Sequence, residues 1–317
     1  MTIVDTIADL SNFSQNQVVR KTVTTSSGGI VAAQHRVAAM AGAAALAEGG
    51  NAVDAAIATS FSIGVAEPWM SGPGGGGAMI VYKADTNETS VIDFNMRSPA
   101  GPDPTDFPLT DGVADDLFPW TRVEGDRNLK GPTAIAVPGL VDGMATAHAK
   151  HATMPWMDLL QPAIALAEAG PHIDWYTSLM TVACVADLAA DPEASRVFLR
   201  DGNAPTAPWT AVVGERLDLS AMAGTLKRLA EAGARDFYEG DLARSIAGDD
   251  HLTKKLNAVI HKIVNQPHEQ KIISAAVVSM LERIRKSQKQ LSKWHLRARD
   301  GGLIDLDLLI QAMRLKH

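Results

Sequence analysis

The spacing of apolar residues divides the chain into segments of different character. Residues 1–27 are polar, with Ser, Thr, Asn and Gln in excess, and are expected to form a loosely held leader. Beyond them, Gly and Pro separate short apolar runs until about residue 250, which is typical of short helices and strands joined by turns. In the last part of the chain, apolar residues recur at helical spacing. The predicted segments are 1–27, 28–250 and 251–317.

The middle segment contains several predicted helices. An Ala-rich run from Arg36 to Ala47, closed by Gly49-Gly50, is typical of a helix with a glycine stop. Residues 51–66 are almost all small and apolar, and a helix that is apolar on all sides must be buried. Asp54 is its one charge. Because the helix dipole favours a carboxylate near the N-terminus, we expect a structural role for Asp54. Further helices are expected at 141–148, 156–168 and 217–232.

Strand-like runs alternate with these helices. Residues 79–83 and 90–94 are separated by Ala84-Asp-Thr-Asn-Glu-Thr, which is rich in turn-forming residues, and together they predict a β hairpin. Residues 30–33 are predicted to form a short strand, and residues 134–140 a strand followed by a turn. Predicted strands and helices therefore alternate along the middle segment.

Residues 251–317 are predicted to be helical and basic. From Glu269 to Arg299, apolar residues at three- and four-residue steps describe one helix face, with Lys and Arg on the other. A second short helix is expected from Asp305 to Leu315. Three interpretations stay open: a helical hairpin packed on the rest of the protein, a partner-binding helix, and a basic amphipathic helix on an anionic surface.

The two larger parts of the chain carry opposite charge. Residues 1–250 hold 16 Lys and Arg against 31 Asp and Glu, a net charge of −15, whereas residues 251–317 hold 13 against 5, a net charge of +8. A reversal this sharp indicates a change of domain or a joint between unrelated segments. The total of −7 argues against nucleic-acid binding by the whole molecule, and the basic segment carries no nucleic-acid-binding motif. No nucleic-acid partner is predicted.

Few isolated residues suggest chemistry. Cys184 is the one cysteine, which excludes an internal disulfide, and its apolar neighbours predict a small buried core residue. The histidines have no metal-ligand spacing with carboxylates or cysteine, so neither a metal nor a cofactor is predicted. Tryptophans near prolines and loops are expected to anchor irregular segments. These histidines and tryptophans are His35, His148, His151, His172, Trp69, Trp120, Trp156, Trp175 and Trp209.

The N-terminus has neither a basic region nor an apolar stretch of the kind found in signal peptides. No run approaches 18 uninterrupted apolar residues, so no membrane span is predicted. The expected location is the cytoplasm.

Five motifs follow one another in a fixed order over about residues 28–248. They are Glu48-Gly-Gly-Asn-Ala-Val-Asp-Ala-Ala, Glu67-Pro with Gly72-Pro-Gly-Gly-Gly-Gly, Val137-Pro-Gly, Gln161-Pro-Ala-Ile-Ala-Leu-Ala-Glu-Ala-Gly and Asp236-Phe-Tyr-Glu-Gly. The glycine-rich run opens onto a strand and is not followed by Lys-Ser/Thr, so it is not a phosphate loop. In this order the motifs resemble the large-subunit portion of the gamma-glutamyltransferase family.

The resemblance implies an N-terminal-nucleophile hydrolase. Such a protein is made as one precursor that cuts itself, and both resulting subunits contribute strands to an αββα sandwich, so the fold expected from the resemblance is of the α+β class. The new N-terminal Thr of the small subunit attacks a γ-glutamyl amide, with its own free amine as base, and the acyl group passes to water or an amino acid. These 317 residues are therefore expected to form an incomplete sandwich followed by the helical segment.

The sequence departs from the family pattern at the nucleophile. No Thr-Thr-His-like run follows the five motifs before His317, and Thr24-Thr25 precedes the first predicted strand, in the wrong place. We therefore assign no catalytic residue, and we expect this chain to be inactive alone and not to cut itself.

A second departure lies where the family carries an Arg that holds the donor's α-carboxylate, in an Asp-Phe-Arg-Glu-like segment. Here Asp93-Phe-Asn-Met-Arg puts Asn95 in that position and Arg97 two residues later. If the strand continues, a shift of two residues keeps the same face, about 6 Å further along. Arg97 is then either an anion clamp or a surface ion-pair residue, and Asn95 and Arg97 are the candidate substrate-binding residues.

Two functions compete. In the first, the chain is part of a γ-glutamyl-transferring enzyme that binds a γ-glutamyl compound when a Thr-bearing chain complements it. In the second, it is a non-catalytic binding or scaffold protein that uses its basic helical tail for a partner. In either case, incomplete sheets expose unpaired backbone groups, so self-association, or cover by residues 251–317, is expected.

Overall fold

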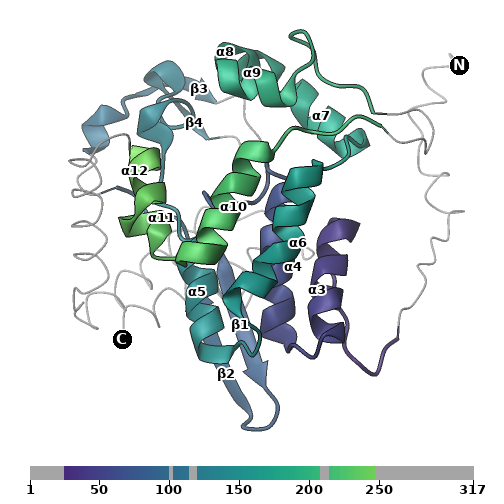
Figure 1. The fold of residues 1–317 in the computed structure, drawn as a ribbon. Helices are drawn as coiled ribbons and strands as arrows, with labels where there is room; N and C mark the ends of the chain where they lie inside the picture. The colour runs from purple at the N-terminus through teal and green to yellow at the C-terminus, as the bar shows by residue number, and fades with distance from the viewer. Residues whose placement is uncertain (1–24, 100–102, 114–119, 208–213, 248–317) are drawn as a thin grey trace, which may run out of the picture. The chain divides into compact units, whose positions relative to one another are not determined.

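The computed structural model describes residues 25–99, 103–113, 120–207 and 214–247 (Figure 1). The predictions made for residues 1–24, for the helical segment 251–317 and for Trp209 lie outside these residues. Contacts divide the chain into two compact units, one of Met1–Ser98 with Pro102–Ala243 and one of Pro99–Gly101 with Arg244–His317. Apart from residues 244–247, which end the last helix, the fold described below is that of the first unit.

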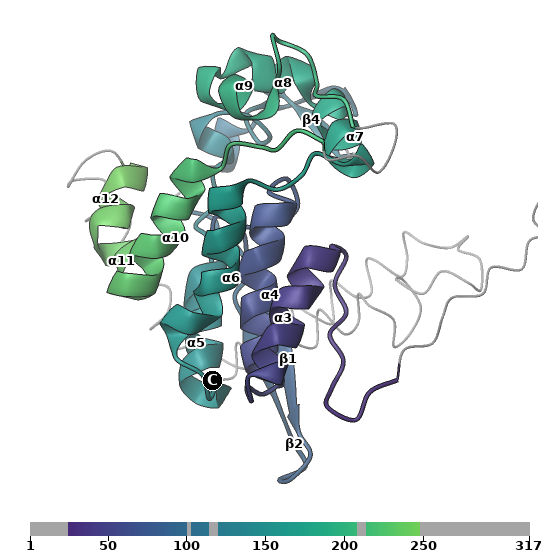
Figure 2. The same ribbon diagram turned by 45° about the vertical axis from the view of Figure 1, so that its right-hand side comes forward.

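Four helices lie side by side in the order α10, α6, α4, α3, in both views of the ribbon (Figures 1 and 2). Small residues bring them close together: a Cβ on Gly42 of α3 would lie 2.8 Å from the carbonyl oxygen of Ala55 in α4. As predicted, α4 is buried on most of its circumference. The helices are α3 (Arg36–Ala47), α4 (Ala52–Ala66), α6 (Trp156–Ala169) and α10 (Ser220–Ala232).

Asp54 fixes the start of α4, which confirms its predicted structural role. Its carboxylate is fully buried and accepts a hydrogen bond from the Asn51 backbone N–H at 2.8 Å, completing a capping box. Thr153 donates to it through its hydroxyl at 2.6 Å and its N–H at 3.0 Å, and Met154 through its N–H at 3.1 Å. Burial acts to raise the pKa of Asp54, but these hydrogen bonds outweigh burial and lower it.

The predicted hairpin is confirmed, with slightly different ends. β1 (Ala78–Lys83) pairs antiparallel with β2 (Glu88–Asp93), and β2 contacts α5 (Leu140–His151). Ile92 is buried, whereas Ile80 and Tyr82 are each 61% exposed. The hairpin therefore has one covered face and one open apolar face.

Two predicted strands are wrong. Residues 30–33 are irregular, and Ile30 is 61% exposed, because no described segment pairs with them. Residues 134–140 begin with the end of a 3₁₀ turn (Pro132–Ala134) and contain a single antiparallel bridge, at Val137. Pro138 has no N–H, so it cannot extend that bridge into a ladder.

The predicted helix 217–232 begins later, at Ser220. Asp218 accepts hydrogen bonds from the Ser220 N–H and hydroxyl, at 3.1 and 2.7 Å, and this local side-chain turn competes with an earlier helical turn.

Several shorter elements had no counterpart in the sequence analysis. β3 and β4 pair antiparallel across an irregular register, and three short helices follow α6. The remaining elements are β3 (Leu109–Val113), β4 (Thr121–Val123), η1 (Pro104–Asp106), η2 (Glu124–Asp126), α7 (Trp175–Ala183), α8 (Val185–Ala190), α9 (Pro192–Phe198), α11 (Asp236–Glu239) and α12 (Asp241–Ala247).

The prediction that Cys184 is buried is wrong. Cys184 is exposed at the junction between α7 and α8. The inward face of α7 carries Thr177 and Thr181, whereas Leu179 and Val182 are more than half exposed. An apolar local sequence therefore did not mean burial here, because it is the hydroxyl-bearing face of α7 that packs.

The tryptophans divide into two groups. Trp156 packs edge-on against Phe61 and donates from Nε1 to the Leu229 carbonyl at 3.1 Å, so it anchors the helix layer as expected. Trp120 and Trp175 are 56% and 70% exposed, so the same expectation is wrong for them. Among the described residues, every helix falls short of the length and apolarity that crossing a bilayer requires.

Candidate functional site

Three motifs far apart in the sequence meet in one backbone network, which we call the loop junction: residues 72–77, 94–97 and 137–140. Gly77 and Phe94 exchange two backbone hydrogen bonds, of 3.2 and 2.8 Å, which extend the hairpin by one pair. Gly75 accepts from the N–H groups of Gly139 and Leu140 at 2.9 and 3.0 Å. The glycine-rich run therefore holds both the segment after β2 and the start of α5.

Glycine is required in the loop junction because backbones approach closely there. A Cβ on Gly76 would lie 2.5 Å from the Met96 nitrogen, and one on Gly139 only 2.0 Å from the Phe94 oxygen. Gly143, one helical turn into α5, leaves room for the Phe94 ring, which a Cβ would meet at 2.1 Å. No flexible side-chain end could move away to relieve the first two contacts.

Arg97 is placed by the last strand-like pairing of this network. β2 ends at Asp93, residues 94–96 are irregular, and Arg97 and Val137 then form an isolated antiparallel bridge with hydrogen bonds of 3.1 and 2.8 Å. A continuous strand from Asp93 to Arg97, on which the shared-face argument depended, is therefore not present. A backbone bridge, and not strand alternation, fixes where Arg97 lies.

The two candidate substrate-binding residues differ in how free their side chains are. Asn95 donates from its N–H and its Nδ2 to the same Asp93 carboxylate oxygen, at 2.9 and 3.0 Å. Arg97 is exposed, and over the described ranges its guanidinium has neither an ion pair nor a hydrogen bond. Arg97 can accept an anionic ligand without breaking an existing contact, whereas Asn95 is already engaged.

Tyr238, in the Asp236-Phe-Tyr-Glu-Gly motif, supports the loop junction through its hydroxyl, a role that the sequence pattern did not indicate. Its hydroxyl donates to the Pro138 carbonyl and accepts from the Asp142 N–H, both at 3.1 Å. Burial raises the pKa of Tyr238 to about 12, so the hydroxyl stays protonated. Arg235 lies 5.8 Å from the centre of the ring and forms an ion pair with Asp142 at 3.5 Å.

The remainder of the Asp236-Phe-Tyr-Glu-Gly motif is structural. Asp236 accepts two hydrogen bonds from the Arg228 guanidinium, at 3.0 and 2.8 Å, and one from the Asp241 N–H at 3.2 Å. These contacts lower the pKa of Asp236, with the Arg228 hydrogen bond as the largest cause. A Cβ on Gly240 would meet the Asp236 carboxylate at 2.0 Å, which accounts for the glycine.

The pKa of Glu67 is raised. The surroundings lower the pKa of five other described carboxylates, which are Asp54, Asp103, Glu193, Asp218 and Asp236. Glu67 is 3% exposed, and its Oε2 is buried with no hydrogen-bond partner in the described structure. Burial is the main cause of the raised pKa. His35 acts to lower it, and Asp174 adds to the increase. Glu67 ends α4 and precedes the glycine-rich run, so it is a buried acid on the approach to the loop junction.

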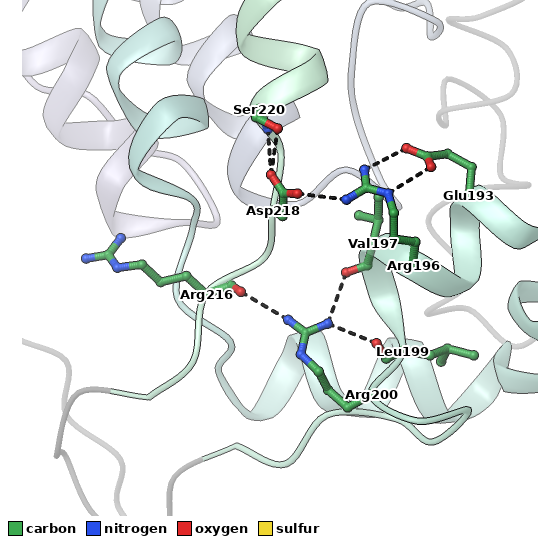
Figure 3. Close-up of polar contacts among 8 residues, drawn as sticks. All are labelled: Glu193, Arg196, Val197, Leu199, Arg200, Arg216, Asp218 and Ser220. Atoms are coloured by element: carbon green, nitrogen blue, oxygen red, sulfur yellow. Dashed lines mark hydrogen bonds and ion pairs between the residues drawn. The ribbon is translucent and has the colours of Figure 1, made fainter.

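In a second polar cluster, drawn in Figure 3, the charged side chains form hydrogen bonds and ion pairs with one another. Arg196 makes a two-pronged contact with Glu193, at 2.9 and 2.7 Å, and a further contact with Asp218 at 2.7 Å. Arg200 donates to the Leu199 and Arg216 carbonyls, at 2.9 and 3.1 Å. The cluster ties α9 to the segment before α10, so we interpret it as structural.

His151 and His148 each have a polar partner at one ring nitrogen, whereas His151 Nδ1 is buried with no partner in the described structure. His151 Nε2 lies 3.2 Å from the Ser90 hydroxyl, and His148 Nε2 lies 2.9 Å from the Met154 carbonyl. In the part of the chain that the structure describes, His, Cys, Asp and Glu do not gather in groups of three that could hold a metal ion.

Comparison with known proteins agrees with the motifs. Residues 38–262 match the family model described as Gamma-glutamyltranspeptidase. The chain is 36% identical over 227 residues to the "Glutathione hydrolase proenzyme" of Bacillus subtilis (strain 168), covering 72% of this chain and 36% of that protein. It is 37% identical over 222 residues to the "Acylase ACY 1 proenzyme" of Pseudomonas sp. (strain V22), covering 70% and 38%. The chain thus spans little more than a third of the length of these relatives.

Solved structures give the same fold. The transpeptidase enzyme CapD of Bacillus anthracis is 29% identical and superposes with a TM-score of 0.57, over 73% of this chain and 69% of that one. The predicted α+β class and N-terminal-nucleophile hydrolase fold are therefore confirmed. By its motifs, its sequence match and its fold, the chain belongs to the gamma-glutamyltranspeptidase family.

Proposed function

We propose that residues 28–250 form the donor-binding part of an enzyme that transfers a γ-glutamyl group, and that Arg97 binds the donor's α-carboxylate. One observation carries this proposal. Arg97 has a backbone fixed by two hydrogen bonds to Val137 and an exposed guanidinium without a partner among the described residues. A planar guanidinium that is free to turn on a fixed backbone suits two-pronged recognition of a carboxylate.

In the proposed reaction a Thr hydroxyl attacks the γ-carbonyl carbon while the free amine of the same Thr takes its proton. The carbon–nitrogen bond of the amide then breaks, the departing amine takes the proton, and an acyl ester remains on Thr. Water or the amine of an amino acid then attacks that ester and gives a proton to the Thr amine, which passes it to the leaving Thr oxygen, so that the acyl product and free Thr result. These 317 residues contain no Thr-Thr-His-like run, so we assign them the donor site and expect the nucleophile on a Thr-bearing segment or chain.

The engaged Asn95 bears on the choice of donor. Arg97 lies two residues beyond the position that the family resemblance gives to the carboxylate-binding Arg, and residues 94–96, between β2 and Arg97, are not part of a strand. The donor is therefore proposed as a γ-glutamyl amide whose α-carboxylate reaches Arg97, with glutathione as one candidate and not the required one.

Binding to matched probes tests this assignment. We expect the full chain, with a Thr-bearing segment added where required, to bind γ-glutamyl-p-nitroanilide more tightly than γ-aminobutyryl-p-nitroanilide, which lacks the α-carboxylate. Arg97→Ala is expected to lose about 1.5–3 kcal/mol of binding to the first probe, roughly 10- to 150-fold, because a charge-assisted hydrogen bond is removed. Binding to the second probe should stay the same.

Arg36→Ala is the control, since Arg36 is also exposed and lies outside the loop junction. An unchanged affinity of Arg97→Ala for the γ-glutamyl probe would remove Arg97 from the donor site. If neither probe binds even with the Thr-bearing segment present, the donor-site proposal itself is wrong, and the alternative of a non-catalytic binding protein with a basic tail, of net charge +8, takes its place.

A further inference from the structure

We propose that Tyr238 is a positioning residue for Arg97: its hydroxyl holds the turn at Pro138, and that turn carries Val137, the backbone partner of Arg97. This inference rests on the proposed function, because it names a residue that sets the donor site without touching the donor. Tyr238 comes from α11, about 100 residues after the turn it holds.

The start of α5 explains why the chain needs a hydroxyl at this place. The first N–H groups of a helix have no partner within the helix, and a side chain at the N-cap usually satisfies one of them. The N-cap of α5 is Gly139, which has no side chain to offer. The Tyr238 hydroxyl takes over this role from outside the helix by accepting from the Asp142 N–H.

The same hydroxyl also donates, to the Pro138 carbonyl at 3.1 Å. A hydroxyl can donate once and accept, so both capacities are used within one turn of chain. Phenylalanine at 238 would keep the ring but leave the carbonyl and the N–H without this partner. Because Tyr238 is only 5% exposed, water cannot freely replace the lost hydroxyl.

The path from this turn to Arg97 is short. Val137 is the covalent neighbour of Pro138, and its N–H and carbonyl both bond to the backbone of Arg97, at 2.8 and 3.1 Å. From Gly139 onward the turn is held by Gly75, and at Pro138 it is held by Tyr238. If the hydroxyl is lost, the Val137–Arg97 bridge keeps its support on one side only.

Tyr238 is itself well fixed, as a positioning residue must be. Its ring packs edge-on against Phe237 at 5.2 Å between centroids, and Arg235 covers it at 5.8 Å. Arg235 is in turn paired with Glu239 and Asp142. The hydroxyl is therefore held in place from its own helix and from the helix it caps.

Hydrogen exchange of single amides tests the positioning directly and does not require any donor. In Tyr238→Phe we expect the amides of Val137 and Arg97 to exchange about fivefold faster or more, the loss that one hydrogen bond implies. The amide of Leu160 in the middle of α6 should be unchanged. Tyr176→Phe is the matched control, because Tyr176 contacts Trp69 and Trp175 through its ring.

Donor binding then links the two proposals. The preference for γ-glutamyl-p-nitroanilide over γ-aminobutyryl-p-nitroanilide should fall about fivefold in Tyr238→Phe, while affinity for the second probe stays constant. A merely structural role would weaken both probes alike. If the Val137 and Arg97 amides exchange at the same rate in Tyr238→Phe, the inference about Tyr238 is wrong, whatever the probe affinities are. If these amides exchange faster but Arg97→Ala does not change the probe affinities, the donor-site assignment is wrong instead.

A labelled protein covers the case in which Tyr238→Phe does not fold. With 3-fluorotyrosine at 238, which retains the hydroxyl, binding of the γ-glutamyl probe should shift the fluorine resonance in the chain with Arg97 and leave it in place after Arg97→Ala. If the fluorine chemical shift does not change on binding of the probe in either protein, the link between Tyr238 and Arg97 is wrong.

Discussion

At the scale of single residues, two buried carboxylates show what burial does with and without hydrogen bonds. Asp54 is surrounded by donors, and its pKa is lowered although it is fully buried. Glu67 is almost as buried, but one of its oxygens lacks a partner within the described structure, and its pKa is raised, mainly by burial. The first acid stabilises the fold as a charged group, and the second destabilises it when charged.

Glu67→Gln is expected to stabilise the protein at neutral pH, by about 1 kcal/mol, because it removes a poorly solvated charge and keeps the shape of the side chain. With a raised pKa, the folded state binds the proton more tightly than the unfolded state. The stability of the parent protein therefore falls as the pH rises from the ordinary pKa of a glutamate through the raised value. Urea unfolding from about pH 4 to pH 8 should show the gain of the variant growing along that rise.

Asp54→Asn is the control with the opposite sign. Its pKa is lowered, so its contribution is present at neutral pH and is lost as the pH falls through the folded-state value. Asp54→Asn should have a lower free energy of unfolding at neutral pH, and its free energy of unfolding should change less at acid pH than that of the parent protein. A Glu67→Gln protein that gains nothing at pH 8 would contradict the account of Glu67 as a destabilising charge.

At the scale of elements, the loop junction shows how a glycine-rich run allows other backbone segments to pack closely against it. The run lies against the segment after β2 and the start of α5, and its hydrogen bonds to both join backbone to backbone. Not every glycine in the run is needed for space. A Cβ on Gly76 would meet Met96 at 2.5 Å, whereas a Cβ on Gly74 would meet nothing within 4 Å.

Two alanine variants two residues apart test this difference. Gly76→Ala is expected to destabilise the protein by about 1–3 kcal/mol, because the backbone of residues 94–96 must move to admit the methyl group. Gly74→Ala should be tolerated with little change. Thermal unfolding of both proteins measures the contrast, and equal melting temperatures for the two would show that residues 94–96 do not lie as close to the run as described.

At the scale of the whole molecule, the open hairpin face bears on assembly. Among the described residues, β1 and β2 pair only with each other, and Ile80, Tyr82 and Val91 leave an apolar face exposed. Sheets with unpaired edges and exposed apolar faces associate unless something covers them. The expectation that residues 251–317 provide such cover, and that the chain otherwise self-associates, stays a prediction.

A shortened protein of residues 1–250 is therefore expected to self-associate more strongly than the full chain, as measured by light scattering. Changing Ile80 and Tyr82 to Lys in the shortened protein should reverse the effect, because the open face then carries charge. If the shortened protein is a stable monomer with cooperative unfolding, then the described fold closes its own core, and residues 251–317 are free for another role.

The sequence alone determined the family, the helices of the central layer, the hairpin and the structural role of Asp54. These follow from local information, because helical spacing, glycine stops and turn residues act over a few positions. The same local reasoning misplaced residues 30–33 and Cys184. A strand needs a partner strand, and burial depends on which face of a helix packs against the rest of the protein. The neighbouring residues in the sequence determine neither of these.

Only the tertiary structure decided how the candidate site is built. It brought the glycine-rich run, the segment carrying Arg97 and the turn at Val137 into one network, and it showed Asn95 engaged and Arg97 free within the described residues. It also gave Tyr238 its position behind that network, across about 100 residues of chain. The physical reason is that a hydrogen bond between distant segments depends on how helices and strands pack together. The sequence pattern within each segment records which element that segment forms, but it does not record which other segment lies beside it.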